Sequence, residues 1–397
     1  MQDRTNFNRR RFLEIMGIGA SILGPSLNAL GEDVAGPSDG EMYLYVGTYT
    51  SSGSKSEGIY ILRFDTRTGE IRPHKVVRGV EEPSFLAIDP AGKYLYAVNE
   101  TLEYRGRKSG AVSSFAVAQK DGTLTFLNEQ PSMGGAPCHV TTSRDGKFVL
   151  VANYMGGNVA VFPVARDGTL GPAVDVEQHS GSGPNKARQE AAHAHSIMLD
   201  QQGKYAFVND LGIDKVMIYE FDGRNGKLRP NPNQPYYGSG PGAGPRHFKF
   251  HPSGKYAFVV NELDMTVSSL LYDPTKGSLK EVHTVSTVPA GYSGENTCAD
   301  LHAHPNGKYV YASNRGHDSI AAFEFDVAIG QLKPVEHVPT RGKTPRNFAI
   351  DSTGKFLLVA NQKSDTIVTF VIDQASGRLK STGHTAKVPS PVCLLLV

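Results

Sequence analysis

Short apolar segments separated by turn residues make up most of this chain, and one arrangement of them recurs. An apolar segment leads to a turn ending in Gly-Lys, and a second apolar segment follows and ends in Asn. The glycines of these pairs recur every 47–57 residues: Gly92, Gly146, Gly203, Gly254, Gly307 and Gly354. The asparagines follow six or seven residues later: Asn99, Asn153, Asn209, Asn261, Asn314 and Asn361. Six copies at matching offsets predict a repeat fold.

Each repeat has room for four strands. In the repeat around Gly254, the apolar segments span residues 245–250, 256–260, 267–272 and 278–285, with turn residues between them. Four antiparallel strands joined by short turns are typical of a propeller blade. Neighbouring blades cover both faces of a blade, so its strands need not alternate strictly between apolar and polar residues.

The two ends of the chain supply the missing parts of one more blade. Residues 43–48 match the second strand of a repeat without a first strand before them, and residues 391–397 match a first strand with nothing after it. Pairing these two segments closes the ring and leaves no open sheet edge. The sequence therefore predicts an all-β, seven-bladed β-propeller over residues 42–397.

The N-terminal residues 1–35 differ from the repeats. Arg9, Arg10 and Arg11 precede an uncharged stretch, residues 15–30, that is interrupted by Pro25. This pattern predicts a twin-arginine-type export signal and linker, and the stretch is too short for a comfortable membrane span. We expect a periplasmic or cell-envelope protein with no stable membrane span once the signal is processed. A disordered basic N-terminus of a cytoplasmic protein is the alternative.

The overall charge and the cysteines exclude several classes of partner. The formal net charge of +2 argues against nucleic acid, which needs a clustered basic face. Cys138, Cys298 and Cys393 are widely spaced, which fits neither a zinc framework nor a disulfide scaffold. We expect three buried thiols and no cofactor. The oligomeric state stays open.

The repeat also predicts where a site lies. The start of each first strand and the residues after each second strand share one rim, and the Gly-Lys turns lie on the opposite rim as solvated turns. On the shared rim the repeats differ, and the residues there are ionisable: Glu100, His193, His195, Arg246, His247, Glu262, Asp300, Arg315 and Arg346. Gathering such groups is costly without a ligand or mutual pairing. We expect a small-molecule site, with ion pairs between blades as the alternative.

A long polar connection, residues 178–194, leads into His193 and His195 and carries Arg188 and Gln189. A loop of this kind is a plausible wall of a binding pocket. A metal site formed by His193, His195 and His247 stays open, whereas His304 belongs to the opposite rim. The glycine-rich residues 238–244 precede a strand and contain proline, so they are a linker loop rather than a dinucleotide fingerprint.

Several motifs resemble one enzyme family. They are Tyr45-Val46-Gly47-Thr48-Tyr49, Arg188-Gln189 with His193-Ala194-His195, Gly244-Pro245-Arg246-His247, Val260-Asn261-Glu262-Leu263, Asp300-Leu301-His302, Ser313-Asn314-Arg315-Gly316 and Pro345-Arg346-Asn347-Phe348. Together they resemble the propeller-type 6-phosphogluconolactonases and the related 3-carboxy-cis,cis-muconate lactonizing enzymes. The resemblance covers residues 42–397 and does not specify one substrate.

The resemblance implies a metal-independent hydrolase that opens a sugar-acid lactone. Its catalytic group would be His195, Arg246, Glu262 and Arg315, with arginines stabilising the oxyanion and Glu262 or His195 taking a proton from water. The substrate-binding residues would be Glu100, Arg188, Gln189, His193, His247, Asp300 and Arg346, and the arginines could hold an anionic substituent. A cycloisomerase using the same groups and a non-catalytic binding propeller are the alternatives.

Overall fold

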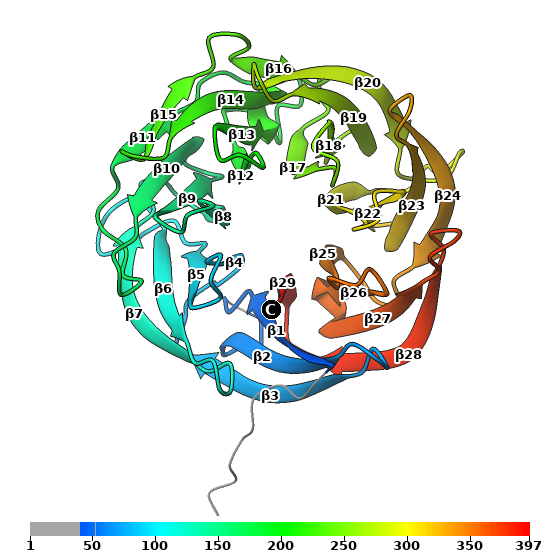
Figure 1. Cartoon of the computed structure of the whole chain (residues 1–397), viewed down its shortest axis with the longest axis horizontal. Helices are drawn as coiled ribbons and strands as arrows, with labels where there is room; N and C mark the ends of the chain where they lie inside the picture. Colours follow the sequence, from blue (N-terminus) through cyan, green and yellow to red (C-terminus); the bar gives the residue numbers. More distant parts are fainter. Residues whose placement is uncertain (1–39, 52) are drawn as a thin grey trace, which may run out of the picture. The chain divides into compact units, whose positions relative to one another are not determined.

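The computed structural model describes residues 40–51 and 53–397, which form seven antiparallel sheets arranged as blades of a ring (Figure 1). Blade 1 contains β29 (Pro391–Leu396), β1 (Glu41–Thr48), β2 (Gly58–Asp65) and β3 (Ile71–Arg78). Blade 2 contains β4 (Leu86–Ile88), β5 (Tyr94–Asn99), β6 (Ala111–Val117) and β7 (Leu124–Pro131). Blade 3 contains β8 (Pro137–Thr142), β9 (Phe148–Asn153), β10 (Asn158–Pro163) and β11 (Asp175–Gln178).

Blades 4 to 7 complete the ring. Blade 4 contains β12 (Ala194–Leu199), β13 (Tyr205–Asp210), the 3₁₀ turn η1 (Leu211–Ile213), β14 (Lys215–Asp222), β15 (Lys227–Pro230) and a fifth strand, β16 (Tyr236–Gly238). Blade 5 contains β17 (Pro245–Phe250), β18 (Tyr256–Asn261), β19 (Thr266–Asp273) and β20 (Ser278–Ser286). Blade 6 contains β21 (Thr297–Ala303), β22 (Tyr309–Arg315), β23 (Ser319–Asp326) and β24 (Gln331–Pro339). Blade 7 contains β25 (Pro345–Ile350), β26 (Phe356–Asn361), η2 (Gln362–Ser364), β27 (Thr366–Ile372) and β28 (Leu379–Lys387).

The C-terminal strand closes the ring as predicted. β29 pairs antiparallel with β1, with Tyr45 opposite Leu395 and Gly47 opposite Cys393. Blade 1 is therefore built from both ends of the chain, and the seven-bladed propeller is confirmed. The export signal predicted for residues 1–35 lies outside the described residues. Within the described part of the chain, no helix is long and apolar enough to cross a membrane.

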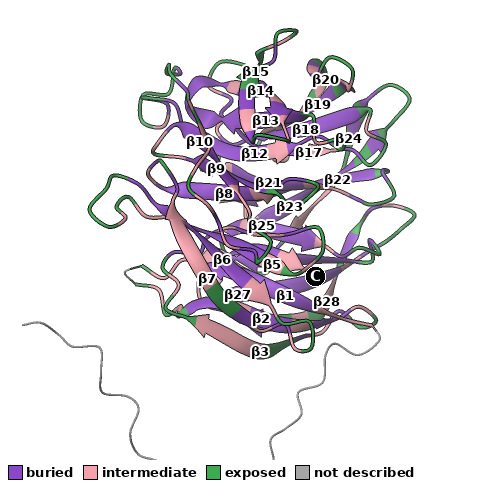
Figure 2. Ribbon diagram, turned by 60° about the vertical axis from the view of Figure 1, so that its left-hand side comes forward, coloured by how far each residue is buried: buried purple, intermediate pink, exposed green. Residues whose placement is uncertain are grey.

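The core lies between the blades, where the sheets face one another (Figure 2). In β26, Leu358 packs in a cluster with residues of blade 1, whereas its neighbours Leu357 and Val359 pack in a cluster with residues of blade 6. All three side chains are fully buried. This two-sided burial explains why apolar residues run consecutively along the second strand of each repeat.

Both repeated features of the sequence have structural roles. The six glycines of the Gly-Lys turns have φ between 67° and 72°, a region that glycine enters without steric cost. The repeated asparagine bonds the connection from the preceding blade in four of the six repeats, whereas Asn261 Nδ2 bonds Thr266 and Ser268 of its own blade. Asn153 Nδ2 donates to the Ser132 carbonyl at 2.8 Å and Asn314 Nδ2 to the Thr287 carbonyl at 2.7 Å. These asparagines therefore hold adjacent blades together.

Candidate active site

A β-bulge interrupts the innermost strand of most blades near its start. On β17, Pro245 pairs with Asn261 and His247 with Val260, so Arg246 between them has no partner. The same register shift leaves an unpaired residue on four other innermost strands: Cys138, His195, Arg346 and Val392. A bulge of this kind re-aims a side chain.

Four of the five bulged residues line one cavity, whereas His195 is not among its lining residues. Its lining residues are Cys138, Arg246, Arg346 and Val392, together with Tyr49, Ser84, Phe85, Glu100 and His247. The cavity has a volume of about 10 Å³, which is near the minimum for one water molecule. The rim residues that the repeat pattern singled out therefore converge at the inner ends of the blades, and we call this region the funnel.

The carboxylate of Glu262 is surrounded by three arginines. Arg188 donates a 2.6 Å hydrogen bond to Oε1, and Arg315 Nη2 lies 2.9 Å from Oε2. Arg246 Nε also lies 2.9 Å from Oε2, but its N–H does not point at that oxygen, so this contact is an ion pair without a hydrogen bond. Glu262 and Arg246 are only 3% and 2% exposed. These three arginines and Glu262 are called the arginine clamp below.

The clamp fixes the charge of its members. Burial alone would raise the pKa of Glu262, but the three guanidinium groups outweigh it and lower the pKa to about 2. Burial and the neighbouring Arg315 and Arg346 lower the pKa of Arg246 to about 10. At neutral pH, Glu262 is an anion and Arg246 is a cation.

Backbone carbonyls complete the orientation of two of these arginines. Arg246 Nη1 donates to the Ala299 carbonyl, and Arg315 Nη2 donates to the Cys298 carbonyl at 2.7 Å. Both carbonyls belong to the irregular start of β21, where Ala299 and Asp300 lie unpaired between Cys298 and Leu301, which pair with β22. The bulge on one strand thus positions arginines from two others.

A second group of polar residues lines the same cavity. Arg346 Nη2 donates to the Tyr49 hydroxyl at 2.8 Å, and that hydroxyl donates to Glu100 Oε2 at 3.0 Å. The Arg346 guanidinium also lies 5.3 Å from the centre of the Tyr49 ring. Burial raises the pKa of Glu100 and the pKa of Tyr49. Tyr49 was not among the predicted site residues, although it ends the 45–49 motif.

His247 and Asp300 form a supporting pair. His247 Nδ1 lies 2.7 Å from Asp300 Oδ1, and its Nε2 lies 3.2 Å from Arg246 Nη1. Because an arginine only donates, His247 Nε2 accepts from Arg246. The ring proton is therefore on Nδ1, which donates a hydrogen bond to Asp300. Asp300 Oδ2 also accepts from Asn347 Nδ2 at 2.6 Å and lies 3.1 Å from His302 Nε2. Asp300 is 1% exposed, so it holds His247 rather than facing the cavity.

His195 and His193 both contact the ring of Tyr154. The His195 ring is 5% exposed, with its centre 5.4 Å from that of His247, and the Cys138 sulfur lies 3.8 Å from its Nδ1. Burial and the nearby Arg246 lower the pKa of His195 well below its usual value, so the imidazole is neutral at pH 7. The His193 ring stacks on Tyr154 at 4.4 Å, and its two nitrogens contact the Tyr154 carbonyl and Glu190.

Two neighbouring residues of the 178–194 connection have different roles: Arg188 belongs to the arginine clamp, and Gln189 anchors the connection itself. Arg188 reaches Glu262, and its Nη2 lies 3.5 Å from the Tyr154 hydroxyl. Gln189, by contrast, is fully buried and donates to the Leu211 carbonyl at 2.8 Å and to Asp214 Oδ1 at 2.6 Å. Gln189 therefore holds the loop against blade 4 and does not reach the cavity.

The funnel has a surplus of positive charge. Four arginines face only two carboxylates, those of Glu100 and Glu262; the arginines are Arg188, Arg246, Arg315 and Arg346. The Asp300 carboxylate is already paired with His247 and His302. This composition suits an anionic group or a carbonyl oxygen that gains negative charge. The three cysteines are free and buried as predicted. Among residues 40–51 and 53–397, no three His, Cys, Asp or Glu side chains are grouped as metal ligands.

Comparison with known proteins relates the chain to lactonases. The family described as "Lactonase, 7-bladed beta-propeller" matches residues 43–396. A 6-phosphogluconolactonase of Bacillus subtilis is 39% identical over 350 residues, covering 88% of this chain and 97% of that protein. A 6-phosphogluconolactonase of Formosa agariphila is 36% identical over 315 residues, covering 78% and 86%. The solved structure of a periplasmic gluconolactonase from Pseudomonas aeruginosa is 34% identical, covers 90% of this chain and 99% of its own, and has a TM-score of 0.83.

Proposed function

Because the chain belongs to the lactonase family of seven-bladed β-propellers, we propose that it hydrolyses a sugar-derived lactone in the funnel around Glu262. The observation that carries this proposal is the arginine clamp. A buried carboxylate holds Arg246 and Arg315 in fixed positions, while the bulge of β17 turns Arg246 toward the cavity. Donors that are fixed before the reaction stabilise a developing oxyanion best, because they need not reorganise.

The lactone carbonyl oxygen would lie against Arg246. Water attack turns this oxygen into an oxyanion, and the guanidinium offers a full positive charge in a nearly dry site. Arg246 is fully buried among charged groups and still keeps its proton at neutral pH, because its pKa is about 10. The ring oxygen then leaves as an alcohol by taking the proton that the base removed from the attacking water, and the product is a carboxylate that the surplus arginines also attract.

Of the two candidate proton acceptors, we propose His195 for the attacking water. Both oxygens of Glu262 already face arginines, and a pKa of about 2 makes this carboxylate a weak base at neutral pH. His195 is neutral and therefore able to accept a proton. As the oxyanion develops beside Arg246, it offsets the positive field that lowers the pKa of His195, so the imidazole becomes more basic during the reaction.

Arg346 is the proposed contact for an anionic substituent or for substrate hydroxyls. It lines the same cavity as Arg246 and donates a hydrogen bond to Tyr49. The names of the relatives include phosphorylated and unphosphorylated gluconolactone as substrates. Together with the predicted export signal, the relationship to a periplasmic gluconolactonase leads us to propose a periplasmic location and an unphosphorylated aldonolactone.

A lactone panel tests the reaction. Purified protein is mixed with glucono-1,5-lactone, 6-phosphogluconolactone and a carboxymuconate, and acid release or ultraviolet absorbance is followed with and without a chelator. We expect acid release from at least one gluconolactone above the rate in buffer, with no effect of the chelator. Turnover of the carboxymuconate alone would instead assign a cycloisomerase, and no turnover of any compound would contradict an enzymatic role.

A further inference from the structure

The repeat is interrupted between blades 1 and 2. At other junctions, the residue after the outermost strand sends a buried side chain into the groove between blades, as Ser132, Thr287 and Thr340 do, each 0% exposed. The amides of these residues donate to carbonyls that precede the third strand of the same blade, and Gly79 makes the matching bond to the Glu57 carbonyl. Gly79 has no side chain to fill the groove, and a Cβ built there meets no atom within 4 Å.

A second departure occurs beside the first. The connection between β5 and β6 spans residues 100–110, whereas the matching connections in blades 3 and 5 span only residues 154–157 and 262–265. Its tip is ordered by a two-residue bridge between Tyr104 and Arg107. Both departures affect the same groove. Gly79 leaves it unfilled, and the 100–110 loop forms one of its sides.

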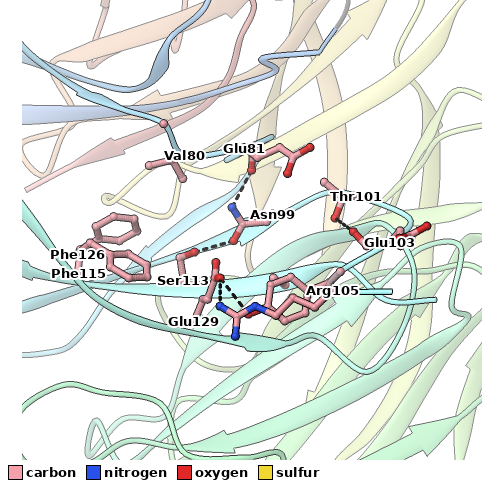
Figure 3. Close-up of a pocket in the computed structure, with 13 residues that line it drawn as sticks. Val80, Glu81, Asn99, Thr101, Glu103, Arg105, Ser113, Phe115, Phe126 and Glu129 are labelled. Carbon is pink, nitrogen blue, oxygen red and sulfur yellow. Dashed lines mark hydrogen bonds and ion pairs between the residues drawn. The ribbon is translucent and has the colours of Figure 1, made fainter. Parts of the chain in front are cut away.

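The result is a pocket of about 350 Å³ (Figure 3), at the lower end of the range for small-molecule sites. At one end, Phe115 and Phe126 meet edge to face with ring centres 5.8 Å apart, and Phe126 is 54% exposed. At the other end, Glu129 accepts from the Tyr104 hydroxyl at 2.9 Å and from Arg105 at 2.8 Å. Asn99 and Ser113 bond each other at 2.7 Å and also line the pocket, with Ser113 opposite Glu129 in the β6–β7 pairing.

The lining favours a neutral, hydroxyl-rich ligand. Glu81, Glu103 and Glu129 outnumber Arg105, so an anion is disfavoured. The Arg105 side chain is exposed and donates to Glu129 through Nη2, so its other N–H groups can reach a ligand oxygen and would repel a cation. Hydroxyl groups both donate and accept, and the flat face of Phe126 offers an apolar surface to the C–H face of a sugar ring.

The pocket and the funnel cavity both share lining residues with one hollow between them. Glu81 and Thr101 also line a hollow of about 550 Å³, and that hollow reaches Tyr49 and Glu100, which line the funnel cavity. Carboxylates line this path, whereas arginines dominate the funnel. The two ends therefore differ in charge: one suits a reacting carbonyl and the other a neutral sugar.

We propose that the pocket between blades 1 and 2 binds a neutral sugar unit of a short oligosaccharide whose terminal lactone ring occupies the funnel. This inference rests on the proposed lactonase function. It assigns the substrate class as oligosaccharide lactones, which are products of oxidation at a sugar's anomeric carbon. An enzyme that oxidises that carbon is then the class of reaction that supplies the substrate.

The test compares glucose-based lactones of one to four units, with either α-1,4 or β-1,4 linkages. In the unaltered protein, kcat/KM should rise by at least about fivefold once the chain is long enough to reach Phe126. Phe126→Ala should abolish this rise and leave the one-unit lactone unaffected. Ile329→Ala, which also removes a half-exposed apolar side chain, should keep the rise. Equal length dependence in both variants would overturn the proposal.

A binding measurement separates this inference from the proposed function. Unoxidised glucose oligosaccharides of the same lengths are added to each protein, and saturation-transfer NMR reports contact with the sugar. If no lactone is hydrolysed but the sugar signal is present and lost in Phe126→Ala, the pocket stands and the lactonase proposal fails. If lactones are hydrolysed without any length effect or sugar signal, the lactonase stands and the pocket proposal is overturned.

Discussion

Arg188 donates a 2.6 Å hydrogen bond to Glu262 across 74 residues of sequence. Arg188 comes from the long loop before β12, and Glu262 follows β18 in the next blade. Gln189, the neighbour of Arg188, anchors that loop through Leu211 and Asp214. The loop is thereby fixed as the outer part of the arginine clamp, and the clamp joins blades 4, 5 and 6.

The first prediction concerns Arg188. Its side chain is 38% exposed, so Arg188→Ala leaves Glu262 paired with two buried arginines and the fold intact. We expect lactone kcat/KM to fall by about tenfold or more, because the Glu262 carboxylate loses the bond that fixes Oε1. Arg378→Ala, which removes a 3.2 Å surface ion pair with Glu336, is the control and should change neither rate nor stability by more than a small amount. A normal rate in Arg188→Ala would remove the loop from the site.

The second prediction concerns Glu262 itself. Glu262→Gln keeps the shape of the side chain but leaves Arg246 and Arg315 buried without their counter-charge. Breaking a buried ion pair from one side costs about 3 kcal/mol, so the melting temperature should fall together with the rate. Differential scanning calorimetry and lactone kinetics on one sample measure both. A large loss of rate with unchanged stability would point instead to a direct role of this carboxylate in proton transfer.

The third prediction uses the tautomer of His247. In Asp300→Asn the amide can donate to Nδ1, which would move the imidazole proton to Nε2 and turn it against the donors of Arg246. We expect kcat to fall by about a hundredfold with a smaller change in KM. Arg246 would keep its positive charge, but His247 would no longer hold its guanidinium in place. Asp351→Asn alters an equally buried aspartate in a Gly-Lys turn of blade 7 and should leave kcat unchanged. Equal kcat values in the two variants would contradict a positioning role for Asp300.

The fourth prediction is a pH dependence of stability. Burial, followed by Arg246, lowers the pKa of His247 to about 4, below the usual value of about 6.5 in an unfolded chain. The folded state thus binds a proton at His247 less readily than the unfolded chain does. The contribution of neutral His247 to the free energy of unfolding is therefore complete above pH 6.5 and is lost as the pH falls toward 4. The size of this contribution is about 3 kcal/mol. Urea unfolding between pH 4 and 8 should show the decline, and His247→Gln should make it shallower, because His195, whose pKa burial also lowers, still contributes. An unchanged slope in the variant would contradict the assignment to His247.

The sequence predicted the ring because each blade repeats the same physical requirement. Each repeat needs a turn glycine with positive φ, two buried strands and an asparagine at the end of the second strand. These residues therefore recur along the sequence at regular intervals. The rim residues were also predictable, because Arg246, Glu262 and Arg315 depart from the repeat at positions that share a rim. A repeat constrains every blade equally, so its exceptions point to the site.

Other features left no readable pattern. The bulge that turns Arg246 into the cavity is a shift of one residue in pairing, and hydrophobic periodicity does not record it. Tyr49 follows β1, which lacks the Gly-Lys turn and the final asparagine of the other second strands, so the repeat did not single it out as the partner of Arg346. Gln189 lies next to a clamp residue in sequence, yet its amide serves the loop. The pocket at Gly79 depends on a side chain that is absent, which only comparison of the folded blades makes visible.

The most direct test of the central claim is guanidinium rescue of Arg246→Ala. Removing this side chain should lower lactone kcat by about a hundredfold or more, because the oxyanion loses its buried donor. Added guanidinium at millimolar concentration, well below denaturing levels, should enter the vacated space and restore a measurable part of kcat, whereas it should do nothing for the unaltered protein. A variant that retains full activity, or one whose lost activity no guanidinium concentration restores while its fold is intact, would contradict the role of Arg246 in the reaction.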